Sequence, residues 1–199
     1  MEYLIIIIVV LVFLNANSSK IKGNKGEKYV DSILREIPGS MVLRDIVLKS
    51  VFGTSQIDNI LISPKGIFVI ETKNYSGWIF GNERSKYWTQ TIYNKKSKFF
   101  NPIRQNYGHI KAIESYLPYK KDICHSLIVF SNRCELKRLE VKTPIIKMRD
   151  LKSYLIYCKS DVFLTKEDIN YYSMILEKNN ITDKNIRKNH VQNIRNNKL

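Results

Sequence analysis

The chain has few of the residues on which small extracellular domains and fibrous proteins depend. It contains 3 cysteines in 199 residues, and the odd number and irregular spacing of Cys124, Cys134 and Cys158 match neither a disulfide framework nor a zinc site. The 8 glycines and 5 prolines are too few for a low-complexity or collagen-like chain. We therefore predict reduced thiols in a reducing compartment and one globular domain, because a chain of this length can be held together by an apolar core alone.

Motifs of several enzyme classes are also missing. No glycine-rich phosphate loop of the Walker type and no Ser, His, Asp nucleophile pattern occurs, which argues against nucleotide hydrolysis and acyl transfer. The three histidines, His109, His125 and His190, are scattered and form no metal-binding pair. We expect them to be surface or capping residues.

Acidic residues are scarce relative to basic ones. The chain has 18 Asp and Glu against 33 Lys and Arg, which gives a formal net charge of +15 and a field that attracts polyanions. Such a charge favours nucleic acid or an anionic membrane surface as the partner. A codon bias toward Lys, Asn and Ile in an AT-rich genome is the alternative cause, and it requires no ligand.

One long apolar run, Tyr3–Leu14, stands near the N-terminus. Extended to Ala16 as a helix it would span about 21 Å, which is less than the hydrocarbon core of about 30 Å. Because Lys20 and Lys22 follow the run, we predict that residues 1–19 form a single-pass anchor and linker that leaves the following domain in the cytoplasm. The alternative is a signal peptide cleaved near Ser18, followed by secretion.

The rest of the chain alternates helical and strand patterns, which predicts an α/β domain over residues 20–178. We expect helices over 26–37, 101–117, 149–158 and 169–178, strands within 41–52, 57–73, 124–131 and 143–148, and short strands with an exposed loop over 74–100. Thr165 and Asp168 form a capping-box pattern before the last helix. Residues 179–199 are predicted to form a basic, flexible tail.

The strands within 57–73 form a hairpin in this interpretation. The turn chemistry of Ser63–Gly66 places Ile62 opposite Ile67. Continued outward, that register sets Asp58 opposite Glu71, with both carboxylates on one side of the hairpin. Like charges in such a pair are destabilising unless something neutralises them.

A lysine completes this charged end of the hairpin. The same register places Gln56 opposite Lys73, on the side that carries Asp58 and Glu71. Two carboxylates can hold Mg2+ (or Mn2+), and a nearby lysine can orient water, which is the apparatus of phosphodiester hydrolysis. The competing interpretation is a solvated hairpin end in which Glu71 merely pairs with Lys73.

These residues also carry a resemblance. Asp58, then twelve residues, then "ETK" (71–73) resembles the core of PD-(D/E)xK phosphodiesterases, the restriction-endonuclease-like superfamily. More specifically, "GNKGEKYV", "QIDNILISPKGIFVIETKNYSG", Trp88 with Gln90, and "FNPIRQNYGHI" occur in the order and spacing of the nuclease-related domain (NERD) family. The resemblance covers about residues 22–178.

Membership of that family implies a fold, an activity and a site. The fold would be a restriction-endonuclease-like mixed central β-sheet flanked by α-helices, and the activity would be metal-dependent nuclease cleavage of DNA or RNA, with DNA favoured. In the matching positions Asp58, Glu71 and Glu27 would hold Mg2+ or Mn2+. Lys73 would position the attacking water, and Gln105 would contact that water or a phosphate.

The resemblance has two departures and one alternative outcome. Ile57 stands where the superfamily signature has Pro, and His109 stands where some exonuclease-like members carry Tyr after the glutamine. The alternative is a catalytically inactive NERD module that keeps the nuclease fold and binds nucleic acid or partner proteins at the membrane.

Aromatic and basic residues outside the motif suggest further contacts with nucleic acid. Trp78 and Trp88 can stack on bases, although core or edge packing is the ordinary role of Trp in a sheet. Lys95, Lys96 and Lys98 can contact phosphates, whereas the ordinary role of such a charge run is a solvated face.

Overall fold

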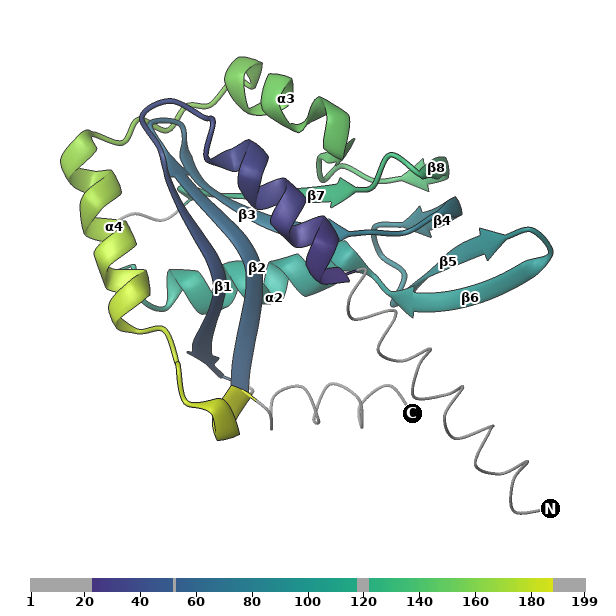
Figure 1. The fold of residues 1–199 in the computed structure, drawn as a ribbon, viewed down its shortest axis with the longest axis horizontal. Coiled ribbons are helices and arrows are strands. Elements are labelled where there is room, and N and C mark those ends of the chain that lie inside the picture. Colours follow the sequence, from purple (N-terminus) through teal and green to yellow (C-terminus); the bar gives the residue numbers. More distant parts are fainter. Residues whose placement is uncertain (1–22, 52, 118–121, 188–199) are drawn as a thin grey trace.

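The computed structural model describes residues 23–51, 53–117 and 122–187, which form two sheets and the helices around them (Figure 1). The larger sheet has the order β1-β2-β3-β7-β9, with β1 (Met41–Ser50), β2 (Gly53–Ser63), β3 (Gly66–Lys73), β7 (Cys124–Phe130) and β9 (Ile145–Lys147). The smaller has the order β6-β5-β4-β8, with β4 (Gly77–Asn82), β5 (Tyr87–Ile92), β6 (Lys95–Phe100) and β8 (Cys134–Glu140). The helices cover 23–34, α2 (Pro102–Glu114), α3 (Leu151–Tyr157) and α4 (Lys166–Lys178), and η1 (Met148–Asp150) is a short 3-10 turn.

The predicted hairpin is β2 and β3, and its register is confirmed from the turn to Asn59; the expected pair of Asp58 with Glu71 lies beyond the end of the ladder. Ser63 pairs with Gly66, Ile62 with Ile67, and the ladder continues to Asn59 opposite Ile70. Gly66 has a φ of 116°, and a Cβ there would lie 2.7 Å from Nε2 of His125. Only glycine meets both demands, so the local turn sequence fixes the register of the whole hairpin.

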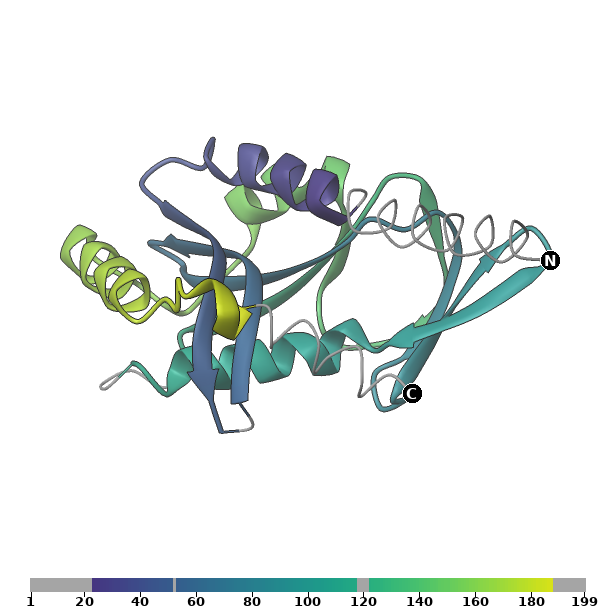
Figure 2. The ribbon, with the colours of Figure 1, turned by 60° about the horizontal axis from the view of Figure 1, so that its bottom comes forward.

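Helices cover both faces of the larger sheet, as Figures 1 and 2 show. One core cluster joins β2 and β3 to α2 and α4, and the other joins the opposite face to helix 23–34 and α3. β1, β2 and β3 are antiparallel, whereas β7 runs parallel to β3. The prediction of a mixed sheet flanked by α-helices is thus confirmed for the larger sheet.

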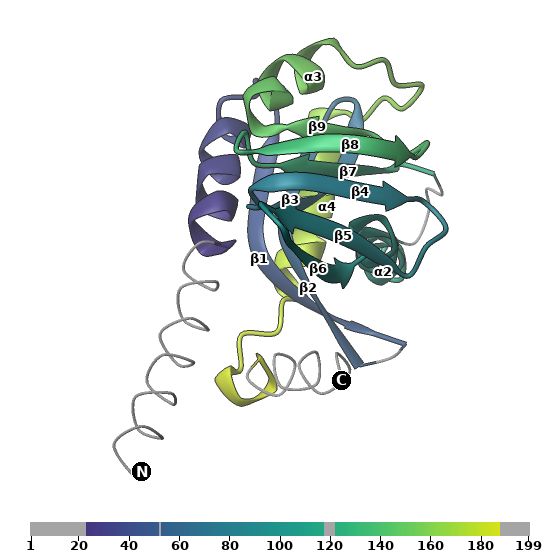
Figure 3. The same ribbon diagram turned by 90° about the vertical axis from the view of Figure 1, so that its right-hand side faces the viewer.

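The short strands expected over 74–100 belong to a second, smaller sheet, whose assembly was not predicted. Its inner face packs through Trp88, which is 1% exposed and stacks on Phe130 of β7 with 6.3 Å between ring centroids. Lys95, Lys96 and Lys98 belong to β6, the outermost strand, and not to a loop as we expected. Long-range pairing of β4 with β8 assembles this sheet, which local sequence patterns cannot reveal (Figure 3).

The helix boundaries follow the predicted capping chemistry. The Asn101 side chain accepts a hydrogen bond from the backbone N–H of Ile103, and Pro102 opens α2. Thr165 and Asp168 form the expected capping box of α4. These local signals place α2 and α4 against the sheet within a few residues of the predicted positions.

The prediction of a single-pass membrane anchor requires correction. Within residues 23–51, 53–117 and 122–187, no helix is long and apolar enough to cross a membrane. A membrane span needs about 20 apolar residues, whereas α2 and α4 have 13 residues each and mixed composition. The run Tyr3–Leu14 lies outside the described residues. Membrane localisation is therefore withdrawn and forms no part of the function proposed below.

The first part of the predicted tail lies on β1. The backbone N–H of Ile181 donates to the carbonyl of Val47 at 2.8 Å, and the side chain of Asn180 accepts from the N–H of Val47 at 2.9 Å. Arg187 forms an ion pair of 2.6 Å with Asp45. Residues 188–199 lie outside the described part of the chain.

Candidate functional site

Asp58 lies at the point where the hairpin ladder ends. The paired residues stop at Asn59 opposite Ile70, and Oδ2 of Asp58 then accepts a hydrogen bond of 3.0 Å from the backbone N–H of Thr72. This bond holds the Asp58 carboxyl beside the residue that follows Glu71. The two acids are thus brought together through the β3 backbone at the end of the ladder.

The ladder between β1 and β2 is also interrupted here, because it skips the pair of Asp45 with Asp58. Asp45 has a left-handed φ of 55°, which aspartate tolerates better than most residues. Ile57 and Ile60 both enter the same core cluster although they are three residues apart, so the strict alternation of sides fails between them. The Gln56 side chain accordingly donates to Asp45 at 2.6 Å, and our expectation that Gln56 faces Lys73 is wrong.

Glu71 is the centre of a buried polar cluster. Glu71 is 1% exposed, and its Oε1 lies 2.6 Å from Nζ of Lys73. The other oxygen, Oε2, accepts from Nε2 of Gln105 at 2.9 Å and lies 3.2 Å from Nε2 of His109. Oε1 of Gln105 in turn accepts from Nζ of Lys73 at 3.1 Å. The four side chains therefore hold one another in fixed positions between β3 and α2.

The pair Glu71 and Lys73 is charged in the folded protein. Burial would raise the pKa of Glu71, but the Lys73 ammonium and the hydrogen bond from His109 outweigh burial and lower it. Burial would likewise lower the pKa of Lys73, but the Glu71 carboxylate raises it well above the ordinary value. Each group stabilises the ionised form of the other in surroundings of low dielectric.

Asp58 has the opposite electrostatic character. Burial, then the Glu71 carboxylate and then the Glu27 carboxylate raise the pKa of Asp58 well above its ordinary value. Lys73 and the hydrogen bond from Thr72 oppose this rise and do not overcome it. Asp58 is therefore the acid whose negative charge the surrounding protein leaves least compensated.

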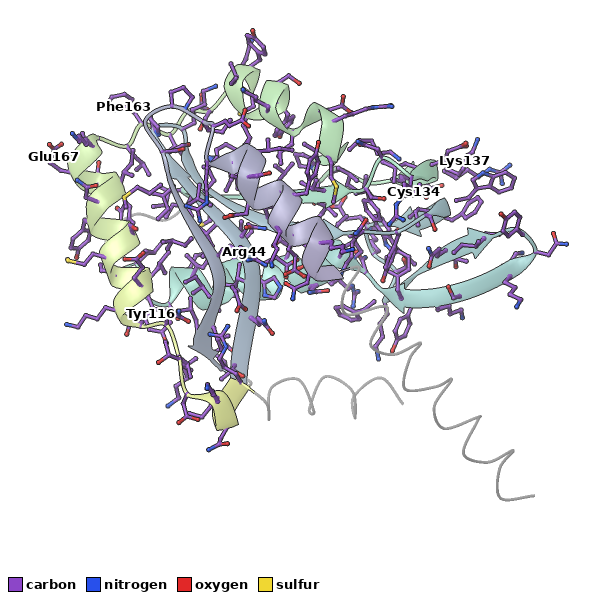
Figure 4. All side chains as sticks on the ribbon, viewed as in Figure 1. Arg44, Tyr116, Cys134, Lys137, Phe163 and Glu167 are labelled. Atoms are coloured by element: carbon purple, nitrogen blue, oxygen red, sulfur yellow. The ribbon has the colours of Figure 1, made fainter. Side chains whose placement is uncertain are left out.

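Glu27 approaches the site from helix 23–34, on the other side of the sheet. Its Oε2 lies 4.0 Å from Nη2 of Arg44, the residue labelled beside this helix in Figure 4. Burial raises the pKa of Glu27, Arg44 lowers it, and Glu71 raises it further. Within the residues that the structure describes, no group of three or more His, Cys, Asp or Glu side chains lies close enough to hold a metal ion. Glu27 is thus an electrostatic neighbour of the cluster.

A close approach of Gly26 to the side chain of Asn74 positions helix 23–34. A Cβ on Gly26 would lie 2.7 Å from Cβ of Asn74, which directly follows Lys73. Glycine therefore allows the first turn of the helix to contact the end of β3. The Asn59 side chain also donates to the carbonyl of Glu27 at 3.4 Å, which ties the helix to β2.

His109 is the site residue that sequence reasoning missed. We expected a surface or capping role, yet His109 is 7% exposed and lies between Glu71 and Ser55, whose Oγ is 2.7 Å from Nδ1. Its position four residues after Gln105 on one helix was the available signal, because such residues share a helix face. The tertiary contact with Ser55 was not accessible from the sequence.

The fold and the site define a class of protein, and comparisons with known proteins then identify the family. Fold and cluster together define an α/β protein with a buried carboxylate, lysine and glutamine site at the end of a β-hairpin. The model of the nuclease-related domain (NERD) matches residues 22–131, and the chain belongs to this family. The chain is 41% identical over 209 aligned residues to an uncharacterized protein of Bacillus anthracis, with 98% of each chain covered. No solved structure matches.

The matched region contains every site residue that was predicted from the sequence. Glu27, Asp58, Glu71, Lys73 and Gln105 all lie within residues 22–131. The general context of this family is the PD-(D/E)xK-like superfamily. Family membership was therefore predicted from the sequence motifs and is confirmed, while the role of each residue is a matter for proposal.

Proposed function

We propose that the protein is a metal-dependent nuclease that hydrolyses phosphodiester bonds of DNA or RNA. The observation that carries this proposal is the contact of Lys73 with Glu71 and Gln105 directly beside Asp58. Membership of a nuclease-related family and the net charge of +15 support a nucleic acid as substrate.

The donor set fits a hard divalent cation such as Mg2+ or Mn2+. Asp58 and Glu71 would hold it, because Mg2+ uses one or two protein carboxylates and completes its shell with water and substrate phosphate. Burial and the Glu71 and Glu27 carboxylates raise the pKa of Asp58, so a cation would neutralise a carboxylate whose charge the protein leaves uncompensated. A cation bound here would polarise the phosphoryl oxygen and neutralise the two acids.

Lys73 acts as a donor and not as a base in this proposal. Its raised pKa keeps the ammonium charged throughout the physiological range. An ammonium has three donors, of which Glu71 and Gln105 take two. The third donor remains for the attacking water or for a phosphate oxygen that gains charge in the transition state.

Gln105 and Glu27 assist from opposite sides of the sheet. Gln105 bridges Glu71 and Lys73, so it holds both groups at a fixed separation. Glu27 adds a third carboxylate whose charge acts on Asp58, and it would help to hold the cation. These two residues therefore position the groups that contact substrate.

The test is cleavage by the full-length protein and by Asp58→Asn. Fluorescent single-stranded DNA, double-stranded DNA and RNA are incubated with Mg2+ or Mn2+, and products are separated on denaturing gels. We expect cleavage by the wild type and a loss of at least about 100-fold in Asp58→Asn, the scale of removing one electrostatic group from an active site. Lys178→Gln, a change on the exposed face of α4, serves as the control. Equal cleavage by wild type and Asp58→Asn overturns the proposal.

A second candidate function rests on the same cluster. Both oxygens of Glu71 are already occupied by donors of the protein itself, so the network is satisfied without a ligand. This closed arrangement favours a catalytically inactive module that keeps the family fold and binds nucleic acid. Salt-sensitive binding without cleavage under either metal, unchanged in Asp58→Asn, identifies that function.

A further inference from the structure

The outer face of the smaller sheet carries aromatic side chains that the core does not use. Trp78 on β4 is 50% exposed and Tyr87 on β5 is 42% exposed, in contrast to the buried Trp88. Phe80 and Phe100 are half-buried between them. An exposed tryptophan on an inner strand of a sheet loses contacts that a core position would provide, so its place requires an explanation.

The strand pairings put these rings and a set of lysines on one face. Trp78 pairs with Thr91, and Thr91 pairs with Lys96, so the three share a side. In the next row Phe80 pairs with Thr89, and Thr89 pairs with Lys98. The outer row is completed by Tyr87 opposite Phe100, whose rings meet edge to face at 6.2 Å. This face, which we call the stacking face, is turned to the viewer in Figure 3.

The charge of the stacking face is positive. Nζ of Lys86 lies 5.3 Å from the ring centroid of Tyr87, and Nζ of Lys137 lies 5.6 Å from that of Trp78. Lys137, in the middle of β8, is labelled in Figure 4. Glu135 pairs with Trp78 across the strands, and Lys137 neutralises it at 2.9 Å. Each exposed ring therefore has a cation next to it.

Ordinary causes explain the lysines but not the rings. Lysines on an outermost strand such as β6 prevent pairing with another sheet, and this accounts for Lys96 and Lys98. That role gives no reason for Trp78, because β4 is paired on both sides by β5 and β8. Aromatic rings beside cations on an open sheet are the arrangement on which unpaired bases stack while phosphates meet lysines.

We infer that the stacking face binds single-stranded nucleic acid, with bases on Trp78 and Tyr87 and phosphates on Lys96 and Lys98. The two rings are about 14 Å apart along and across the strands, so they receive different bases. Gly77, at the start of β4, comes four residues after Lys73, so the two are at most about 14 Å apart. A nucleic-acid strand bound near Trp78 therefore starts a short distance from Lys73 along the chain, and the inference rests on the proposed nuclease function and deepens it.

The inference is tested by binding in EDTA, where metal-dependent cleavage does not occur. The full-length protein is titrated against fluorescein-labelled oligo(dT) of about 12 nucleotides, within the site sizes of single-strand binders, and anisotropy is recorded. We expect Trp78→Ala and Tyr87→Ala each to bind about tenfold more weakly. Trp78→Phe should keep most of the affinity. Tyr157→Ala, which removes an 80% exposed ring from α3, should bind as the wild type does.

Charge and stacking are separated by salt and by competitors. Removing the phosphate contact of Lys98 by Lys98→Gln should reduce the slope of log affinity against log salt by about 0.7, while Lys178→Gln should leave it unchanged. Duplex DNA and heparin should compete less well than oligo(dT). The inference is overturned if Trp78→Ala binds as tightly as wild type, or if heparin binding depends equally on Trp78. It is also overturned if sedimentation shows a dimer that Trp78→Ala dissociates.

The outcome is distinguishable from that of the proposed nuclease function. Oligo(dT) binding that depends on Trp78, without cleavage under Mg2+ or Mn2+, retains this inference and removes the nuclease proposal. Cleavage that Trp78→Ala leaves unchanged, with unchanged oligo(dT) binding, removes this inference alone.

Discussion

Nζ of Lys73 lies 2.6 Å from Oε1 of Glu71, two residues earlier on β3 and on the same side of that strand. The Glu71 side chain is 2% exposed and the Lys73 side chain is 15% exposed, so this ion pair is largely shielded from water. A buried pair of this kind is costly to break from one side only.

The stability of this pair can be measured by a double-mutant cycle. Lys73→Met should lower the free energy of unfolding by about 3 kcal/mol, because it leaves the Glu71 carboxylate buried without its cation. Adding Glu71→Gln should restore most of that loss, since the double variant buries no charge. Urea unfolding followed by circular dichroism gives the change in the free energy of unfolding for Lys73→Met, for Glu71→Gln and for the double variant. Additive effects of the two substitutions would show that the pair is not coupled.

Asp58→Asn should separate stability from activity. The amide keeps an acceptor for the N–H of Thr72 and removes a charge that Glu71 and Glu27 disfavour. We therefore expect higher stability in EDTA together with the loss of cleavage described above. A folded-state pKa above the unfolded value means that ionised Asp58 destabilises the fold, so the gain should be small near pH 4 and should grow as the pH rises toward the folded-state pKa. Urea midpoints measured across that range test the sign.

His109 should act by positioning Glu71. His109→Ala removes the contact of 3.2 Å with Glu71 and leaves Ser55 Oγ without its ring partner. We expect cleavage to fall about 10- to 100-fold in kcat with little change in KM, because His109 contacts another side chain and not the substrate. His109→Gln, which can still donate to Glu71, should recover part of the rate. Tyr107→Ala, at a 61% exposed position on α2, is the control.

Gly26 should tolerate no side chain, because the side chain of Asn74 lies close to it. Gly26→Ala places a Cβ 2.7 Å from Cβ of Asn74, so helix 23–34 must shift, at a cost of about 1 to 3 kcal/mol. Asn74→Gly should relieve that clash in the double variant. Gly108→Ala is the matched control, because no atom lies within 4 Å of the new Cβ and the change should stabilise α2 by about 0.5 to 1 kcal/mol. Thermal unfolding of the four proteins compares these effects, and an unshifted Gly26→Ala would contradict the close contact.

Local sequence signals predicted the framework well. The turn Ser63–Gly66 set the register that the structure confirms to Asn59 opposite Ile70, because φ at Gly66 and the period of two act over neighbouring residues. The capping chemistry at Asn101 and at Thr165 placed α2 and α4 for the same reason. The motif around Asp58 and "ETK" also led to the correct family.

Other features depended on residues far apart in the chain. The left-handed Asp45 on β1 ends the regular alternation of β2 and redirects Gln56, and no local pattern in β2 signals this. His109 joined the cluster only because α2 packs against β3 and places Ser55 on the far side of the ring. Such contacts arise from packing between elements, whose register relative to one another is not encoded in either element alone.

The two tryptophans show most clearly which features follow from the sequence and which depend on the tertiary structure. Composition and spacing identified Trp78 and Trp88 as candidates for base stacking and could not tell them apart. The pairing of β4 with β5 and β8 buries Trp88 against Phe130 and leaves Trp78 open to solvent. Turns, caps and the family motif are set by short-range geometry that the amino-acid order contains. Which ring faces water, and which histidine supports the carboxylate, were decided only when distant strands and helices packed together.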